Sequence, residues 1–368
     1  PPPWDPIAGD YVAADGWIRL HTNAPHHREA ALAVLQTPAD KDAVAAAVAR
    51  WQTDELEAAV VQRGGCAAAM RDLASWSEHP HGRAVASEPL AWIDDGDPAA
   101  HPNWPLVRNR PLAGIRVLDL TRVLAGPVAT RFLAGFGAEV LRIDPPGWDE
   151  PGVIPSVTLG KRCARLDLRQ PDERAVFEEL LASADVLVHG YRPDALRRLG
   201  LDAAARRRLR PGLVDVSLDA YGWSGPWQGR RGFDSLVQMS SGIAAEGLRR
   251  YRTDRPKPLP VQALDHATGY LIAASVVRGL TRRLTEGKGS ITRTSLARTA
   301  ALLTTAPIAE RNEAFAPKSA ADFNAAIEQT SWGPARRMKP PVMVDGAAMR
   351  WDLPATALGS SRPIWISH

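Results

Sequence analysis

The residue with the clearest chemical potential is an aspartate at the start of a long predicted helix. Asp265 stands in the run QALDH (262–266), and helical spacing then continues to about Thr285, just before Gly287. A carboxylate at a helix start is commonly a plain N-cap. In the same place, backbone N–H groups would also keep a carboxylate ionised, as a nucleophile requires. The local sequence leaves both roles open.

Other chemical signatures are missing. The loop TRVLAGP (121–127) has a single glycine, so the pyrophosphate of a dinucleotide could not approach its backbone, and NAD or FAD is not expected. GKGS (287–290) lacks the Walker spacing, and GWSG (222–225) is not a nucleophile elbow. The histidine pairs at 26–27 and 79–81 have no accompanying carboxylate spacing, so we expect no metal.

Composition excludes several further classes. Hydrophobic residues make up 45% of the 368 residues and charged residues 23%, which predicts a packed globular chain. The only cysteines, Cys66 and Cys163, fit a reducing cytoplasm and no disulfide framework. No apolar run approaches the ~18–20 residues that a membrane span needs. The arginine runs at 206–208 and 230–231 lack interleaved aromatic residues, so nucleic acid is not an expected partner.

Residues 1–107 are predicted to form a small α+β domain. YVAADGWIRL (11–20) is typical of two strands around an Asp-Gly turn. Helical spacing follows over 28–35 and over an alanine-rich stretch from 40 to 61. Residues 94–111 are rich in Asp, Pro and Asn and are expected to form a linker. We place the domain boundary near residue 108.

Residues 108–315 are predicted to form a Rossmann-like, doubly wound α/β domain. Helices are expected after Pro127, over 171–182, over 193–209 and from His266 onward. Between them, strands are predicted at 115–120, 139–144, 165–168, 185–191, 213–220 and 291–296. This alternation indicates a parallel sheet covered on both faces. Residues 316–368 lack periodicity and are expected to lie as an extended tail on the large domain.

Four successive segments resemble the family III CoA-transferases of the CaiB/BaiF type. That group includes formyl-CoA and carnitine CoA-transferases and the related α-methylacyl-CoA racemases. The segments are 111–144 (PLAGIRVLDLTRVLAGP…), 160–201 (GKRCARLDLRQPDE…), 221–247 (YGWSGPWQGRRGFDSL…) and 259–290 (LPVQALDHATGYLI…). They follow the family's order without large gaps, and the stretch that contains them, 111–290, is about half of the chain.

The resemblance implies a bound coenzyme A or acyl-CoA, held along the strand ends of the large domain. Arginine suits the 3′-phosphate and pyrophosphate of CoA because its forked N–H donors match phosphate oxygens. Taken singly, an arginine of this kind lies on a solvated helix face as commonly as it binds a phosphate. Carried over by position, the CoA contacts would be Leu124, Ala125, Arg169, Tyr191, Arg192, Arg198 and Arg231.

The same resemblance assigns Asp265 as the nucleophile. Its carboxylate would attack the acyl-CoA carbonyl, and the CoA thiolate would then open the resulting anhydride to give an aspartyl-CoA thioester. The acceptor acid would repeat the two steps in reverse. The expected activity is therefore an acyl-CoA transferase that moves CoA between a thioester and a carboxylic acid.

Two alternatives stay open. The resemblance implies that a racemase of this group would carry its proton-transfer residues at the positions of Phe233 and Ala24, and neither of these side chains can titrate. A catalytically silent CoA-binding subunit is the other alternative. The small-domain likeness (11–35 and 64–90) precedes the Rossmann-like part instead of following it, and the family's glycine-rich loop has no clear counterpart. This order indicates a rearranged chain or the latter part of a longer two-copy protein. The resemblance implies a homodimer, which depends on the family's chain order, whereas a longer two-copy protein would form an intrachain pseudo-dimer.

Overall fold

The computed structural model describes residues 4–306 and 316–366. Contacts group these residues into two compact units. Unit 1 takes residues 4–92, 218–268 and 293–306, and unit 2 takes residues 93–217, 269–292 and 316–366. The linear division expected from the sequence does not anticipate this grouping, because the chain returns to unit 1 twice after residue 108. The predicted domain end at residue 315 lies outside the described residues.

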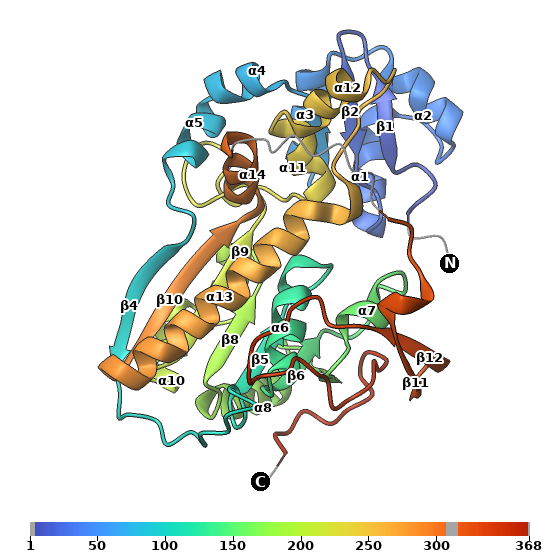
Figure 1. Ribbon diagram of the computed structural model, residues 1–368. Coiled ribbons are helices and arrows are strands. Elements are labelled where there is room, and N and C mark those ends of the chain that lie inside the picture. The colour runs from blue at the N-terminus through green and yellow to red at the C-terminus, as the bar shows by residue number, and fades with distance from the viewer. Residues whose placement is uncertain (1–3, 307–315, 367–368) are drawn as a thin grey trace. The chain divides into compact units, whose positions relative to one another are not determined.

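A seven-stranded sheet runs through unit 2. Most of its strands can be followed in Figure 1. The neighbouring pairs β9–β8, β8–β5, β5–β6 and β6–β7 are all parallel. The predicted α/β fold with a mostly parallel sheet is thereby confirmed. In spatial order the strands are β4 (Trp92–Pro98), β10 (Lys288–Ser295), β9 (Val214–Asp219), β8 (Val186–His189), β5 (Arg116–Leu120), β6 (Glu139–Asp144) and β7 (Lys161–Arg165).

Helices cover both faces of this sheet. Leu118 and Leu120 of β5 share a buried cluster with Phe177, whereas Asp119 between them accepts a hydrogen bond from Thr130. Because successive strand residues point to opposite faces, the helices that carry Phe177 and Thr130 lie on opposite faces. The helices of unit 2 are α6 (Ala125–Gly135), α7 (Ile154–Val157), α8 (Pro171–Ala182), α9 (Pro193–Arg198), α10 (Ala203–Leu209) and α13 (Ala263–Glu286) from Gly269 onward.

Unit 1 is built on a three-stranded antiparallel sheet. β1 (Gly9–Val12), β2 (Trp17–Leu20) and β3 (Ala67–Ala69) pair in that order, which confirms the strand pair predicted around the Asp-Gly turn. Ile18 and Leu20 enter a buried core with Val44 and Leu56. The helices are α1 (Pro25–Leu35), α2 (Lys41–Val48), α3 (Thr53–Gln62), α4 (Leu73–Glu78), α5 (Pro80–Ser87), α11 (Asp234–Ser240), α12 (Ile243–Tyr251), the 3₁₀ turn η1 (Pro260–Gln262) and α14 (Leu296–Thr305).

Two strands differ from the sequence prediction. The segment expected to be a linker over 94–111 begins as β4, an edge strand whose Gly96 lies so close to the backbone of Gly289 that a side chain would not fit. β7 occupies 161–165 instead of 165–168. Its first residue, Lys161, is a charged residue that is 1% exposed, and nothing in the local sequence announces that burial.

The C-terminal segment is more ordered than an extended tail. It contains an antiparallel hairpin of β11 (Phe323–Thr330) and β12 (Gly333–Met338). Beyond the hairpin, the Trp351 side chain lies against Gly160 and donates its indole N–H to the carbonyl of Arg131, 2.8 Å away. The predicted lack of regular structure was therefore wrong for the hairpin, while residues 339–366 contain no helix or strand.

Candidate active site

The loops that follow β5, β6 and β8 meet at one edge of the unit 2 sheet. These strands are neighbours and parallel, so their carboxyl ends share an edge, which is where ligands bind in doubly wound folds. Leu124 and Ala125 lie at the start of α6 after β5, and Tyr191 and Arg192 lie between β8 and α9. The structure therefore brings four of the seven predicted CoA contacts to a common edge.

A buried ion pair holds the beginning of the first loop. The Lys161 ammonium lies 2.8 Å from Asp119 Oδ2 and 2.6 Å from Thr130 Oγ1. The other carboxylate oxygen, Oδ1, accepts the Thr121 backbone N–H at 2.9 Å and its hydroxyl at 2.5 Å. All four residues are buried. The buried charges thus fix Thr121, the residue that immediately precedes the half-buried part of the loop.

A second buried network holds the loop two residues later. Val123 has φ 64°, a conformation that strains a β-branched residue. Its N–H is fixed by Glu150 Oε1 at 2.7 Å, and Glu150 Oε2 is in turn 3.0 Å from Arg142. Arg142 is fully buried and also forms two hydrogen bonds with Asp144. The loop conformation is therefore imposed by charged partners from β6 and the loop after it.

Tyr191 is joined to the first loop by an arginine. Arg122 Nη2 donates to the Tyr191 hydroxyl at 3.0 Å. The same guanidinium lies 5.2 Å from the Tyr191 ring centre and 4.5 Å from that of Trp148. Sequence reasoning assigned no role to Arg122 or Trp148. The available signal was position, since both follow strand ends of the predicted sheet.

Of the other predicted arginines, three belong to unit 2 and one to unit 1. Arg169 is exposed and forms two 2.8 Å hydrogen bonds with Asp167, and Arg198 pairs with Asp194 one turn away on α9. To bind CoA, each of these two arginines would have to break its ion pair with the neighbouring aspartate and contact a phosphate instead. Arg192 is exposed at the start of α9. Arg231 belongs to unit 1, where its Nη1 donates to the Gly64 carbonyl at 2.7 Å.

Asp265 lies in unit 1, buried in the first turn of α13, and a second carboxylate caps that turn. Asp234 Oδ2 accepts the backbone N–H groups of Leu264 at 2.8 Å and Asp265 at 3.2 Å. Burial raises the pKa of Asp265 well above its ordinary value, and the nearby charge of Asp234 raises it further. The first-turn N–H groups that were expected to stabilise the Asp265 carboxylate donate to Asp234 instead, a residue whose role the sequence did not reveal.

The segment that leads into Asp265 is also held at its beginning, at Leu259, by Gln238, which is itself bound to Asp234. Gln238 Nε2 donates to Asp234 Oδ1 at 2.7 Å, and Gln238 Oε1 accepts the Leu259 N–H at 2.7 Å. Between these anchors, Val261 and Gln262 have φ values of 56° and 51°. A strained turn held at both ends is a common way to position a reactive side chain.

Phe233 and Ala24 occupy the two positions where a racemase would carry its proton-transfer groups. The Phe233 ring stacks on the ring of His21, with centres 3.7 Å apart and planes at 10°. Burial lowers the pKa of His21 to about 3, with smaller effects from His27 and Arg19. Ala24 is the N-cap of α1 and forms no side-chain capping bond. The imidazole beside Phe233 is therefore neutral at ordinary pH.

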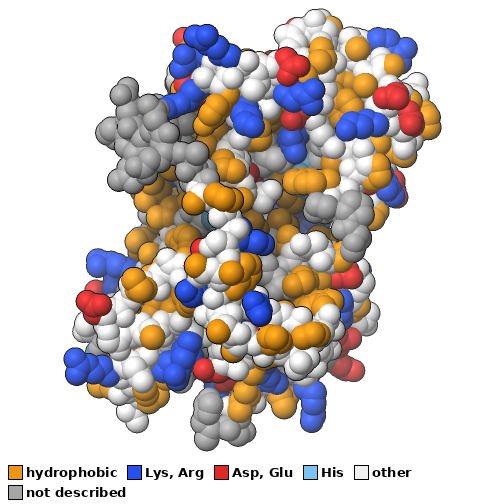
Figure 2. Space-filling model, turned by 45° about the vertical axis from the view of Figure 1, so that its right-hand side comes forward, with side chains coloured by type: hydrophobic (Ala, Val, Ile, Leu, Met, Phe, Trp, Pro, Cys, Tyr) orange, Lys and Arg blue, Asp and Glu red, His pale blue; other side chains and the backbone are white. Residues whose placement is uncertain are grey.

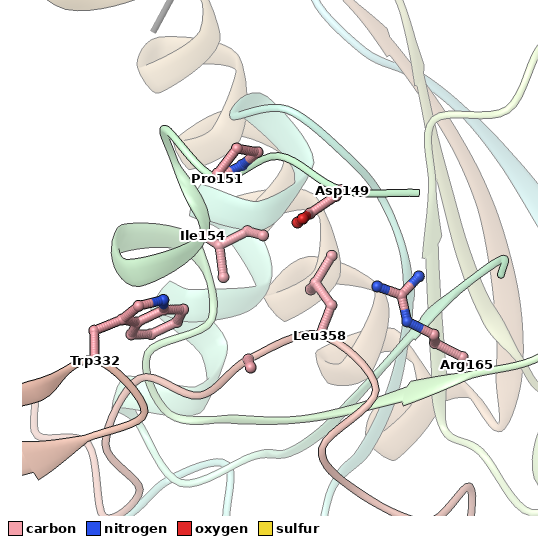
Figure 3. A pocket seen from close by; sticks show the side chains of 7 residues that line it. Asp149, Pro151, Ile154, Arg165, Trp332 and Leu358 are labelled. Carbon is pink, nitrogen blue, oxygen red and sulfur yellow. The ribbon is translucent and has the colours of Figure 1, made fainter. Parts of the chain in front are cut away.

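A small pocket of about 180 Å³ lies elsewhere in unit 2. Figure 3 shows Pro151 and Ile154 on one side of it and Trp332 and Leu358 from the C-terminal segment around the rest. Asp149 and Arg165 supply its charges, and Ala357 completes the lining. Arg165 Nη1 also donates to the carbonyls of Pro145 and Trp148, so the pocket borders the loop that carries Trp148.

Positive charge is dispersed and partly buried. Figure 2 shows Lys and Arg side chains scattered over the face in view, not gathered into one patch. From the two arginine runs, Arg206 is buried against Asp215 and Arg230 pairs with Glu57 at 2.6 Å. Within the described ranges, no helix is long and apolar enough to cross a bilayer. In the same ranges, no three His, Cys, Asp or Glu side chains are grouped so that they could hold a metal ion.

Comparison with known proteins places this sequence in one family. Residues 112–330, more than half of the chain, match CoA-transferase family III. The chain is 34% identical over 208 residues to an acetyl-coenzyme A transferase of Hypoxylon pulicicidum, covering 55% of this chain and 34% of that protein. It is 33% identical over 193 residues to the succinyl-CoA:glutarate CoA-transferase of Mus musculus, covering 49% and 44%.

A crystal structure of a hypothetical protein from Mycobacterium tuberculosis is similar at 30% identity and a TM-score of 0.48, over 53% of this chain and 57% of that one. This chain spans between a third and a half of the length of the first curated relatives it matches. The extent of the family match decides the assignment: the chain belongs to CoA-transferase family III.

Proposed function

We propose that this chain acts as an acyl-CoA transferase, moving CoA between an acyl-CoA thioester and a carboxylic acid, with Asp265 as the nucleophile. An Asp265 oxygen attacks the thioester carbonyl carbon, the C–S bond breaks and CoA leaves as thiolate. The thiolate then attacks the Asp265 carbonyl carbon of the anhydride and expels the donor acid, leaving an aspartyl-CoA thioester. The acceptor carboxylate reverses the two steps.

The observation that carries the proposal is a buried carboxyl pair in a chain of this family. Asp265 is 6% exposed and lies beside Asp234, on a turn that Asp234 and Gln238 fix at both ends. A plain N-cap would accept backbone N–H groups itself, whereas here Asp234 accepts them. Asp265 therefore does not serve as the N-cap of α13, which leaves its carboxyl group available to act as a nucleophile.

The raised pKa of Asp265 has a consequence for this chemistry. Only the carboxylate is nucleophilic, so attack requires Asp265 to lose a proton that burial and Asp234 help it to keep. Once formed, a desolvated carboxylate is more reactive than a hydrated one. The reaction should therefore be slow in acid and accelerate as pH rises toward the raised pKa.

The test is intact-mass spectrometry of the full chain after incubation with acyl-CoA thioesters that differ in chain length and charge. A CoA-sized or acyl-sized adduct is expected for the wild type and not for Asp265→Asn. Asp202→Asn, which alters an N-cap on α10, is the matched control and should behave as wild type. No adduct from any thioester, although CoA binds, would overturn the proposal and favour the silent CoA-binding subunit.

The assembly we propose is a homodimer, or a pseudo-dimer within one longer polypeptide, in the cytoplasm. Two reduced and buried cysteines, Cys66 and Cys163, support a reducing compartment. Light scattering of the purified chain measures its mass in solution. A single monomeric mass at all concentrations would contradict the homodimer.

A further inference from the structure

The guanidinium of Arg122 is held in an unusual environment at the carboxyl edge of the unit 2 sheet. It lies 4.5 Å from the Trp148 ring centre and 5.2 Å from that of Tyr191, and these rings follow β6 and β8, the two strands that flank β5. Among the described residues, no carboxylate forms an ion pair with Arg122. Within the part of the chain that the structure describes, the guanidinium contacts two aromatic faces and one phenol oxygen.

We infer that Arg122 is a phosphate-binding residue for the nucleotide end of CoA, preorganised by Trp148 and Tyr191. This inference rests on the proposed function and goes beyond it, because neither Arg122 nor Trp148 is among the contacts expected from the family resemblance. It names the diphosphate of CoA as the group that the stack recognises.

The geometry of a guanidinium explains why the stack leaves Arg122 able to bind. Aromatic rings contact the faces of the planar group, whereas its five N–H donors point outward within the plane. In the described structure, one of those donors meets the Tyr191 hydroxyl at 3.0 Å. The in-plane fork that matches two phosphate oxygens remains the natural partner for an anion. Tyr191, accepting from Arg122, also keeps its own proton to donate to the same ligand.

The backbone of Arg122 is fixed on both sides. Thr121 before it is bound by Asp119, and Val123 after it is bound by Glu150, both through buried ionic networks. The main chain that carries the Arg122 side chain is therefore already ordered before a ligand binds. Little conformational entropy is lost on binding, which favours affinity.

Two further observations at the same edge point to an anion. α6 starts two residues after Val123, at Ala125, without a side-chain cap, so its first N–H groups add partial positive charge there. The indole N–H of Trp148 is buried and has no acceptor among the described residues. Buried donors are nearly always satisfied, so a ligand oxygen is a reasonable missing partner.

The test compares the binding of CoA, ADP and pantetheine to the full chain by calorimetry. Pantetheine carries the thiol end without phosphates, and ADP carries the phosphates without the thiol. Arg122→Gln should weaken CoA and ADP binding by about 10- to 100-fold, the loss of a charged hydrogen-bonding partner, and leave pantetheine unchanged. Arg174→Gln is the matched control, since it removes the same charge from an ion pair with Glu178 on α8.

Two more variants separate stacking from charge. Arg122→Lys keeps the charge but loses the planar fork and should recover only part of the affinity. Trp148→Phe keeps a ring face and loses the indole donor, so a smaller loss confined to the phosphate-bearing ligands is expected. Tryptophan fluorescence of wild type minus that of Trp148→Phe should change on adding ADP and stay constant on adding pantetheine.

The outcomes distinguish this inference from the proposed function. If wild type binds CoA and Arg122→Gln binds it as tightly as Arg174→Gln does, the inference is overturned and the proposed function stands. If wild type binds ADP in an Arg122-dependent way but shows no preference for CoA, the phosphate site stands and the transferase proposal fails. If wild type binds none of the three ligands, both are overturned.

Discussion

The Oδ2 atom of Asp234 lies 3.2 Å from the backbone nitrogen of Asp265, so one carboxylate caps the helix turn on which the other is carried. The two acids are 31 residues apart in sequence and belong to α11 and α13. Burial raises the pKa of Asp234 too, although hydrogen bonds from Gln238 and from the N–H groups of Asp265 and Leu264 oppose this. The charge of Asp234 in turn contributes to raising the pKa of Asp265, after the larger effect of burial.

Replacing Asp234 with asparagine should shift the pH dependence of adduct formation. The variant keeps a side-chain oxygen for the α13 N–H groups but removes the charge that helps to raise the pKa of Asp265. Adduct formation with an acyl-CoA should then rise at lower pH than in the wild type, while the loss in stability stays near ~1 kcal/mol. Quenched-flow mass spectrometry over a pH series gives both curves. Superimposable curves would show that Asp234 does not act on Asp265 electrostatically.

Asp265→Asn should stabilise the chain at neutral pH while abolishing the adduct. A carboxyl whose folded pKa is raised contributes its full stability below the unfolded pKa, and that contribution is lost as pH rises through the folded pKa. The difference in unfolding free energy between variant and wild type should therefore grow from about pH 4 upward and level off above the folded pKa. Each tenfold difference between the folded and unfolded acid dissociation constants of Asp265 adds about 1.4 kcal/mol to it.

Urea unfolding at several pH values measures that difference. A variant that is equally destabilised at every pH would instead mean that Asp265 has a hydrogen-bonding role in the fold. The raised pKa would then make no contribution to the free energy of unfolding. Asp202→Asn provides the comparison, because it removes a carboxylate with a lowered pKa, and its effect should run in the opposite direction with pH.

Local sequence signals predicted the regular elements of unit 2 well. α8 begins at Pro171 with Asp172 and Glu173 in its first turn and then shows apolar spacing, so its bounds were found in full. β7 was misplaced because Lys161 has the character of a loop residue, and its burial depends on partners distant in sequence, above all Asp119, 42 residues away. β4 was missed because an edge strand of sequence DDGD gives no alternating apolar pattern.

The site shows the same division between local and long-range information. The resemblance pointed to Asp265. The capping of its helix turn by Asp234 is a tertiary contact that the spacing of residues in the sequence does not predict. Leu124 and Tyr191 could be assigned to strand ends from the alternation of elements. The stack of Arg122 between Trp148 and Tyr191 depends on β5 lying between β6 and β8, an order that the sequence does not state.

The chain should not exchange the α-proton of an acyl-CoA with solvent. Phe233 cannot accept a proton, and the imidazole of His21 that stacks on it has a pKa of about 3, too weak a base to remove an α-proton at neutral pH. Incubation of an α-methylacyl-CoA with the protein in D₂O, followed by proton NMR, should show no loss of the α-proton signal. Deuterium incorporation that persists in Asp265→Asn would revive the racemase alternative.

Breaking the buried pair of Lys161 and Asp119 should destabilise unit 2 and loosen the loop of Arg122. Burial works to raise the pKa of Asp119, but Lys161, Arg142 and hydrogen bonds from Lys161 and Thr121 outweigh it, and the net pKa is lowered. Lys161→Met leaves this carboxylate buried without its nearest cation, which should cost about 3–5 kcal/mol in the free energy of unfolding.

The exposed pair offers the control: Arg174→Met, which breaks an i, i+4 contact with Glu178, should cost only about 0.3–0.5 kcal/mol. Adding Asp119→Asn to Lys161→Met removes the stranded charge and should recover part of the loss, so the double variant is more stable than Lys161→Met alone. Because Asp119 also holds Thr121, ADP binding should weaken in Lys161→Met in proportion to the disorder of that loop. A Lys161→Met protein as stable as Arg174→Met would mean that the buried carboxylate is satisfied without its lysine.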